Sequence, residues 1–173
     1  MSVVAVRKYP DRLVFAADSI RVSGYLKESQ RVAGQDMAKL FEVNDMVIGG
    51  VGLSMELSFM RIFARTHKPK AANTEAFLDF IVEFYSWASG KDSSFAHRSE
   101  YLIGFGNEVF RVADGYLIDK INEFSAIGAG EHFSLTAMHL DKSPQEAVEI
   151  ANELCVFCSP PVKVVEQPFK SES

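Results

Sequence analysis

Residues 126–159 read AIGAGEHFSLTAMHLDKSPQEAVEIANELCVFCS, and the order of features in this stretch decides the fold. The stretch opens as a strand that runs into the turn Gly128–Gly130, where two glycines permit a sharp reversal of the backbone. A short helix follows. A second helix starts at Ser143, which suits the N-cap position, and a proline takes the first helical position. Glu146 completes a Ser-x-x-Glu capping box. The stretch therefore predicts a strand, a glycine turn and two successive helices.

Strands and helices are expected in blocks along the rest of the chain. The apolar patterns predict strands at 2–7, 13–19, 38–43, 46–52, 101–105, 109–112, 116–118, 121–127 and 162–166. The helical spacings predict helices at 53–66, 74–89, 131–140 and 144–157. This order is typical of a four-layer αββα sandwich, in which helix pairs cover the outer faces of two packed antiparallel sheets. The predicted fold class is α+β, with residues 1–173 as one domain.

Charge and composition exclude several kinds of partner. The formal net charge is −5 and there is no basic stripe, which argues against nucleic acid and anionic membranes. No run approaches the roughly 20 apolar residues that span a bilayer, and the first residues lack a signal-peptide pattern. Cys155 and Cys158 form a CxxC without a second ligand pair, so we expect packed thiols, no metal and no other cofactor. The absence of a disulfide framework favours the cytoplasm.

The series of motifs resembles the proteasome β-type and HslV-type peptidases over roughly residues 2–158. Its C-terminal part is the glycine turn followed by the helix AVEIANELC. Its N-terminal part is a β-hairpin whose second strand ends in Ala-Ala-Asp-Ser at 16–19, followed by a central hairpin that ends in glycines at 49–52. The order of the motifs makes the match specific, because no single motif is decisive. The resemblance implies the N-terminal nucleophile hydrolase fold for nearly the whole chain.

The resemblance also implies a site built on the first residue of the processed chain. In those peptidases an N-terminal threonine supplies the nucleophilic hydroxyl, and its own amine or a water acts as the base. A lysine lowers the pKa of that pair, an aspartate holds the lysine, and a serine after the glycine turn assists. Backbone N–H groups of a glycine loop hold the oxyanion.

Carried over to this chain, the resemblance retains the aspartate as Asp18 and loses the other side chains. Alignment of the Val-Val-Ala-Val strand puts Met1 at the threonine position, with one extra residue in the first hairpin turn. The lysine position, taken four residues before Leu40, is Asp36, and a carboxylate cannot replace a cation there. The assisting serine is replaced by Ala129.

The oxyanion loop is expected in the backbone of Gly50, Gly52 and Leu53, although Gly52-Leu53-Ser54 stands where the family has Ala-Gly-Gly. Lys27, Arg31 and Lys39 are candidate substitutes for the missing cation, but Lys27 and Arg31 lie in a polar stretch expected to form a loop or hairpin tip. The period-two spacing of Lys39 to Met37 and Phe41 predicts a solvent-facing strand residue instead.

These losses lead to a first hypothesis of a proteasome-like or HslV-like subunit whose threonine-peptidase site is degenerate and inactive. Its role would be to assemble into a ring or cage. The expected partners are further copies of the chain in a stacked ring, together with an ATPase or another assembly protein. Large apolar residues on predicted helices, namely Met55, Phe59, Phe63 and Phe95, are expected at the contacts between subunits.

The alternative hypothesis is an active N-terminal serine endopeptidase or amidase. Removal of Met1 would expose Ser2, and the spacing from Ser2 to Asp18 equals the family spacing if the hairpin turn carries no extra residue. That register reverses the facing of Ala5 and Arg7, which argues against it. The alternative remains open at the level of sequence.

Overall fold

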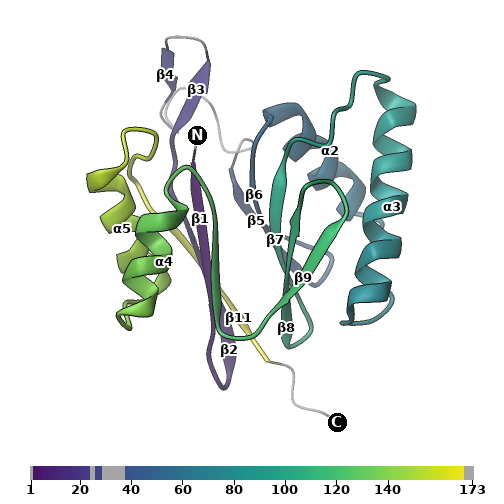
Figure 1. Ribbon diagram of the computed structural model, residues 1–173. Coiled ribbons are helices and arrows are strands. Elements are labelled where there is room, and N and C mark those ends of the chain that lie inside the picture. The colour runs from purple at the N-terminus through teal and green to yellow at the C-terminus, as the bar shows by residue number, and fades with distance from the viewer. Residues whose placement is uncertain (1, 24–25, 29–37, 170–173) are drawn as a thin grey trace.

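Two antiparallel sheets lie face to face at the centre of the molecule, and a pair of helices covers the outer face of each (Figure 1). The computed structural model describes residues 2–23, 26–28 and 38–169, so Met1 and Asp36 lie outside the described residues. The layers follow the order helix, sheet, sheet, helix. This order confirms the α+β, four-layer sandwich predicted from the sequence of elements.

The first sheet joins strands from both ends of the chain. In spatial order it contains β10 (Phe124–Gly128), β1 (Val3–Lys8), β2 (Arg12–Ala17) and β11 (Lys163–Pro168). The second sheet keeps the order of the sequence and contains β5 (Leu40–Val43), β6 (Met46–Val51), β7 (Glu100–Phe105), β8 (Glu108–Ala113) and β9 (Leu117–Ile121). A separate hairpin of β3 (Arg21–Ser23) and β4 (Leu26–Glu28) was not among the predicted strands.

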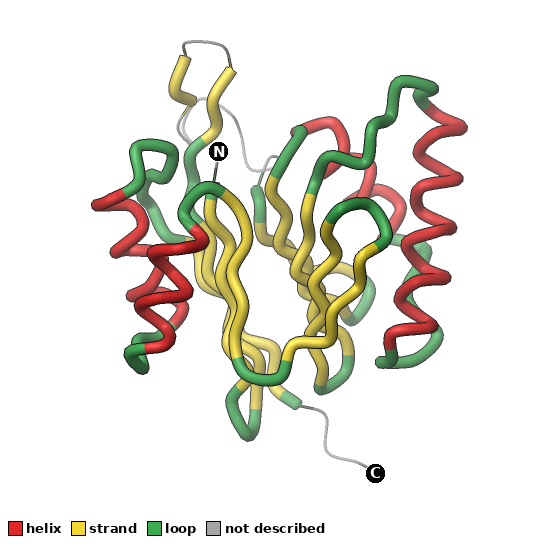
Figure 2. Tube along the Cα trace, in the orientation of Figure 1, coloured by secondary structure: helices red, strands yellow, loops and turns green. Residues whose placement is uncertain are grey.

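The helices pair as the sequence predicts. The described helices are α2 (Ser54–Ala64), α3 (Thr74–Lys91), α4 (Glu131–His139) and α5 (Pro144–Leu154). Figure 2 shows α2 and α3 on the side of the five-stranded sheet and α4 and α5 on the opposite side. None of these helices combines the length and apolar character needed to cross a membrane. The structure differs in that α3 continues to Lys91, whereas the predicted helix ended at residue 89.

The β1–β2 hairpin closes on the two-residue turn Pro10-Asp11. The Tyr9 N–H donates to the Arg12 carbonyl at 2.8 Å. Two residues are the commonest and tightest hairpin loop, so this turn leaves no room for the extra residue that the sequence alignment placed there. The uninterrupted ladder sets Asp18 beside Val3.

Both faces of β1 are buried, because the strand lies in an inner layer of the sandwich. Val4 and Val6 face the second sheet, whereas Val3 and Ala5 pack beneath α4 and α5. A shift by one residue would exchange one buried face for another. The reversed facing of Ala5 and Arg7 is therefore no longer a reason to reject the hairpin without an extra residue.

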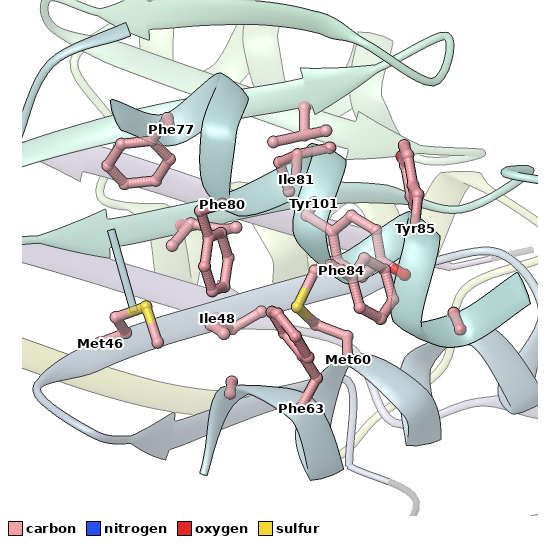
Figure 3. Close-up of a cluster of buried hydrophobic side chains, with 14 of the residues drawn as sticks. Met46, Ile48, Met60, Phe63, Phe77, Phe80, Ile81, Phe84, Tyr85 and Tyr101 are labelled. Carbon is pink, nitrogen blue, oxygen red and sulfur yellow. The ribbon is translucent and has the colours of Figure 1, made fainter. Parts of the chain in front are cut away.

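An aromatic core joins α2 and α3 to the second sheet (Figure 3). Phe77 of α3 stacks on Phe110 of β8 with ring centroids 3.9 Å apart. Phe63 and Phe95 also lie in this core, with only 1% and 7% of their surface exposed. The prediction that these two residues are available for subunit contacts is therefore wrong. Of the predicted contact residues, Met55 is the clearly exposed one at 38%.

The two sheets approach each other closely where glycines replace larger residues. A Cβ atom added at Gly49 of β6 would lie 2.5 Å from Val4 Cγ1 on the first sheet. One added at Gly104 of β7 would lie 3.0 Å from both Leu13 Cδ1 and Phe15 Cζ. Since real Cβ atoms do not approach so closely, these glycines set the distance between the sheets.

Candidate active site

One end of the sandwich gathers most of the residues that the sequence analysis selected. The start of β1, the β10–α4 turn and the β6–α2 connection all lie at this end (Figure 1). The Gly130 N–H donates to the Ser2 carbonyl at 3.2 Å. A Cβ added at Gly128 would lie 2.5 Å from the Ser2 carbonyl oxygen and 3.1 Å from Val51 Cγ1. Ser2, the glycine turn and the end of β6 therefore meet.

Asp18 is buried next to this meeting point, and both of its carboxylate oxygens are hydrogen-bonded. Oδ1 accepts the Val3 N–H at 2.8 Å and the Lys39 ammonium at 2.7 Å. Oδ2 accepts the N–H groups of Ile20 and Ser159, each at 3.2 Å. A buried carboxylate is tolerated when it is paired and fully hydrogen-bonded. Asp18 thus fixes the backbone immediately after Ser2 and holds Lys39 beside it.

Lys39 is the cation paired with Asp18, whereas the sequence alignment assigned the lysine position to residue 36, which lies outside the described residues. The Lys39 side chain is only 10% exposed, so the prediction of a solvent-facing residue is wrong. Lys39 lies at a bend just before β5, where the alternation of a regular strand does not apply. Its carbonyl accepts the Gly50 N–H at 2.8 Å, while its side chain reaches across to Asp18 on the first sheet.

Burial lowers the pKa of the Lys39 ammonium below its ordinary value of 10.5, although the charge of Asp18 and its hydrogen bond act in the opposite direction. Val3 and Lys39 donate to the same Asp18 oxygen, so the ammonium lies within a few ångström of the Val3 amide. A positive charge is thereby placed near the residue that precedes Val3, which is Ser2.

The three predicted members of the oxyanion loop have different partners. The Gly50 N–H donates to Lys39, and the Leu53 N–H donates to Ser99 Oγ at 3.1 Å. Within the described part of the chain, the Gly52 N–H is the one of the three with no hydrogen-bond acceptor. Gly52 has a φ of 129°, a conformation that favours glycine. Gly52 is therefore the member able to donate to a ligand.

Ala129 lies in the turn beside Ser2 and is exposed. Its side chain is a methyl group, which cannot take part in proton transfer. Its carbonyl accepts the Cys155 thiol at 3.6 Å. The site therefore brings together Ser2, Asp18 and Lys39, but its fourth side-chain position carries no functional group.

Two buried thiols lie behind the glycine turn, as expected for packed cysteines. Burial, followed by the charge of Asp18, raises the pKa of Cys158 from 9.0 to about 12. Cys158 is consequently a protonated thiol at neutral pH and does not compete with Ser2 as a nucleophile. Among the described residues, no cluster of His, Cys, Asp and Glu has the arrangement of a metal site.

Comparison with solved structures places this arrangement in a known fold. The chain is similar to BPH of Thiobacillus denitrificans, with a TM-score of 0.85 and 19% identity over 98% of this chain and 100% of that chain. It is similar to eukaryotic HslV of Trypanosoma brucei, with a TM-score of 0.67 and 16% identity over 95% of this chain and 98% of that chain. Anbu (ancestral beta-subunit) of Yersinia bercovieri gives a TM-score of 0.73 and 14% identity over 96% and 81% of the two chains. No family model and no curated protein sequence matches the chain.

The fold is thus that of the proteasome-like, N-terminal nucleophile hydrolases, which confirms the resemblance stated from the sequence. Identities between 14% and 19% carry the fold and nothing finer. The chemistry of the site has to be argued from the residues of this chain.

Proposed function

We propose that this chain is an N-terminal serine hydrolase of proteasome-like fold, which cleaves peptide or other amide bonds with Ser2 once Met1 is removed. The observation that carries the proposal is the buried pair between Lys39 and Asp18, 2.7 Å apart and next to Ser2. The hypothesis of an inactive subunit rested on Met1 at the threonine position, Asp36 at the lysine position and Ala129 at the serine position. If Lys39 is the cation of the site, the carboxylate at position 36 is no longer a reason to expect an inactive protein.

The reaction follows from the groups that surround Ser2. The free amine of Ser2 accepts the proton of its own hydroxyl, and Oγ attacks the carbonyl carbon of the bound amide. The developing oxyanion accepts a hydrogen bond from the Gly52 N–H. The tetrahedral intermediate then collapses to an ester on Ser2 as the leaving amine takes the proton. A water molecule then attacks the ester, and the Ser2 amine takes a proton from that water. The amine passes the proton to Ser2 Oγ, which restores the hydroxyl as the carboxylic acid leaves.

Lys39 contributes through its charge. A nearby cation disfavours protonation of the Ser2 amine and favours ionisation of the hydroxyl, so the amine is available as a base near neutral pH. Asp18 orients Lys39 and the Val3 amide through one oxygen, which makes it a positioning residue in this scheme. The methyl group of Ala129 adds nothing to proton transfer.

Labelling by an epoxyketone probe tests the proposal directly. Epoxomicin is a suitable probe, since BPH has been solved in complex with it. We expect N-terminal sequencing to begin at Ser2, intact mass to show one probe per chain, and labelling to disappear in Ser2→Ala. Ser134→Ala is the control, because it removes a buried serine hydroxyl in the α4–α5 layer. An N-terminus that retains Met1, or labelling unchanged in Ser2→Ala, would reject the proposal.

A second candidate, the inactive assembly subunit, is favoured by Ala129, whose methyl group stands in place of the assisting hydroxyl. It predicts no labelling and no hydrolysis above background. Both candidates include association of identical subunits into a ring, with a further ATPase or assembly protein as partner. Light scattering of the purified protein tests this association, and a monomer at micromolar concentration contradicts it.

A further inference from the structure

We propose that Glu56, acting through Ser99, is a positioning residue that holds the Gly52–Leu53 loop in the conformation needed at the candidate oxyanion site. The inference rests on the proposed function of Ser2. It concerns two side chains that take no part in the chemical scheme above.

Glu56 is a carboxylate in the first turn of α2 with only 1% of its surface exposed. Its oxygens accept backbone N–H groups from Ala96 at 3.3 Å, Arg98 at 3.0 and 3.2 Å, and Ser99 at 2.8 Å. Hydrogen bonds to a charged acceptor are stronger than those between neutral groups. The 96–99 segment before β7 is therefore bound tightly to the start of α2.

Ser99 transmits this anchoring to the loop. It is 2% exposed, and its Oγ accepts the Leu53 N–H at 3.1 Å. It also packs against Gly52, because a Cβ added there would lie 2.5 Å from Ser99 Oγ and 2.7 Å from Ser99 Cα. Ser99 thus holds the loop through a hydrogen bond at Leu53 and through close packing against Gly52.

The Gly52 N–H is fixed between two bound neighbours. Gly50 is tied to Lys39 and Leu53 is tied to Ser99, so the intervening peptide has little freedom to rotate. A donor stabilises an oxyanion most when it is oriented before the reaction. Loss of Ser99 Oγ would release Leu53 and allow the Gly52 N–H to turn away, while the groups on Ser2, Asp18 and Lys39 remain.

Two variants, Ser99→Ala and Glu56→Gln, test this arrangement. For each we expect kcat for an amide substrate to fall about 10- to 100-fold, with KM within about twofold. Hydrogen–deuterium exchange followed by mass spectrometry should show exchange at least about tenfold faster at the Leu53 amide, whose hydrogen bond to Ser99 is lost in Ser99→Ala. Ser134→Ala, which also removes a buried hydroxyl hydrogen bond, should change neither quantity.

The result that overturns the inference is an unchanged exchange rate at the Leu53 amide in Ser99→Ala, or a kcat that matches Ser134→Ala. If Glu56→Gln fails to fold, Ser99→Ala decides alone. If the wild-type protein shows no Ser2-dependent hydrolysis, the proposed function is rejected. The exchange measurement then still decides whether Glu56 and Ser99 hold the loop.

Discussion

At the scale of single residues, the burial of the Lys39 side chain is the clearest difference between the sequence-based prediction and the structure. Strand alternation predicted an exposed side chain, but the bend before β5 breaks the alternation. The residue pairing in the predicted hairpin of residues 38–52 indicates the position of Lys39 more reliably than strand alternation does. With Asn44 and Asp45 at the turn, Leu40 lies opposite Gly49, and the next pair is Lys39 with Gly50. The hairpin register could therefore have predicted that Lys39 lies at the glycine loop. The spacing of four residues before Leu40, taken from the resemblance, instead selected Asp36.

The energetic weight of the Lys39–Asp18 pair can be measured against an exposed pair of the same chemistry. We expect Lys39→Met to lower the free energy of unfolding by about 3–5 kcal/mol, because it leaves Asp18 buried without its cation. Lys68→Met is the control. Lys68 meets Asp45 at 2.8 Å, but the two side chains are 42% and 51% exposed, and the expected cost is below about 1 kcal/mol. Equal costs in urea denaturation would contradict the buried role.

Ala129 offers a gain-of-function prediction. Its place in the glycine turn beside Ser2 suits a hydroxyl that shares the proton transfer. We expect Ala129→Ser to raise kcat about tenfold. Ala71→Ser, an exposed substitution in the loop before α3, should leave kcat unchanged. Steady-state hydrolysis of a fluorogenic amide distinguishes the two, and no gain from Ala129→Ser would mean that this position does not contribute.

At the scale of elements, the sequence predicted well wherever the signal was local. The second C-terminal helix begins as its capping residues require, since Ser143 Oγ accepts the Glu146 N–H at 3.2 Å and Glu146 accepts the Ser143 N–H at 2.9 Å. The β3–β4 hairpin was missed because three-residue strands in a polar stretch carry too few residues for a period-two pattern.

The same cap gives a pH prediction. Hydrogen bonds from the Ser143 N–H, then from its hydroxyl and from Lys142, lower the pKa of Glu146 from 4.5 to about 2. A lowered carboxylate pKa stabilises the fold above the unfolded value, and this stability is lost as the pH falls through the folded value. We expect Glu146→Gln to be less stable than wild type above pH 4.5 and to converge with it near pH 2. Glu153→Gln on the same helix controls for the lost charge, and a difference constant with pH would contradict the linkage.

At the scale of the whole molecule, the four-layer order could be predicted from the alternating blocks of strands and helices along the chain. Each predicted helix pair has an apolar face that packs on one sheet and a polar face toward solvent. The spacing between the sheets could not, since it depends on contacts between residues far apart in the chain. Gly104 illustrates this, because its neighbours Leu13 and Phe15 lie on the other sheet. Nothing in the sequence around Gly104 identifies those partners.

Gly104→Ala tests the packing of the two sheets. We expect a loss of about 1–3 kcal/mol in the free energy of unfolding, because the new methyl group must displace Leu13, Phe15 and the Gln167 side chain. Gly90→Ala is the matched control. It lies in α3 with open space around it, so alanine should raise stability by up to about 1 kcal/mol. If both variants shift the thermal midpoint alike, the sheets have more room than the contacts indicate.

The strand order of the first sheet has a consequence for biosynthesis. β1 and β2 are synthesised well before their outer neighbours β10 and β11. The bonds that complete the surroundings of Ser2 and Asp18 come from Gly130 and Ser159. If Ser2 is the nucleophile, as proposed, a nascent chain carries it through most of translation without a finished site. In that scheme, hydrolysis requires synthesis through residue 159, and we expect a shorter chain to be inactive.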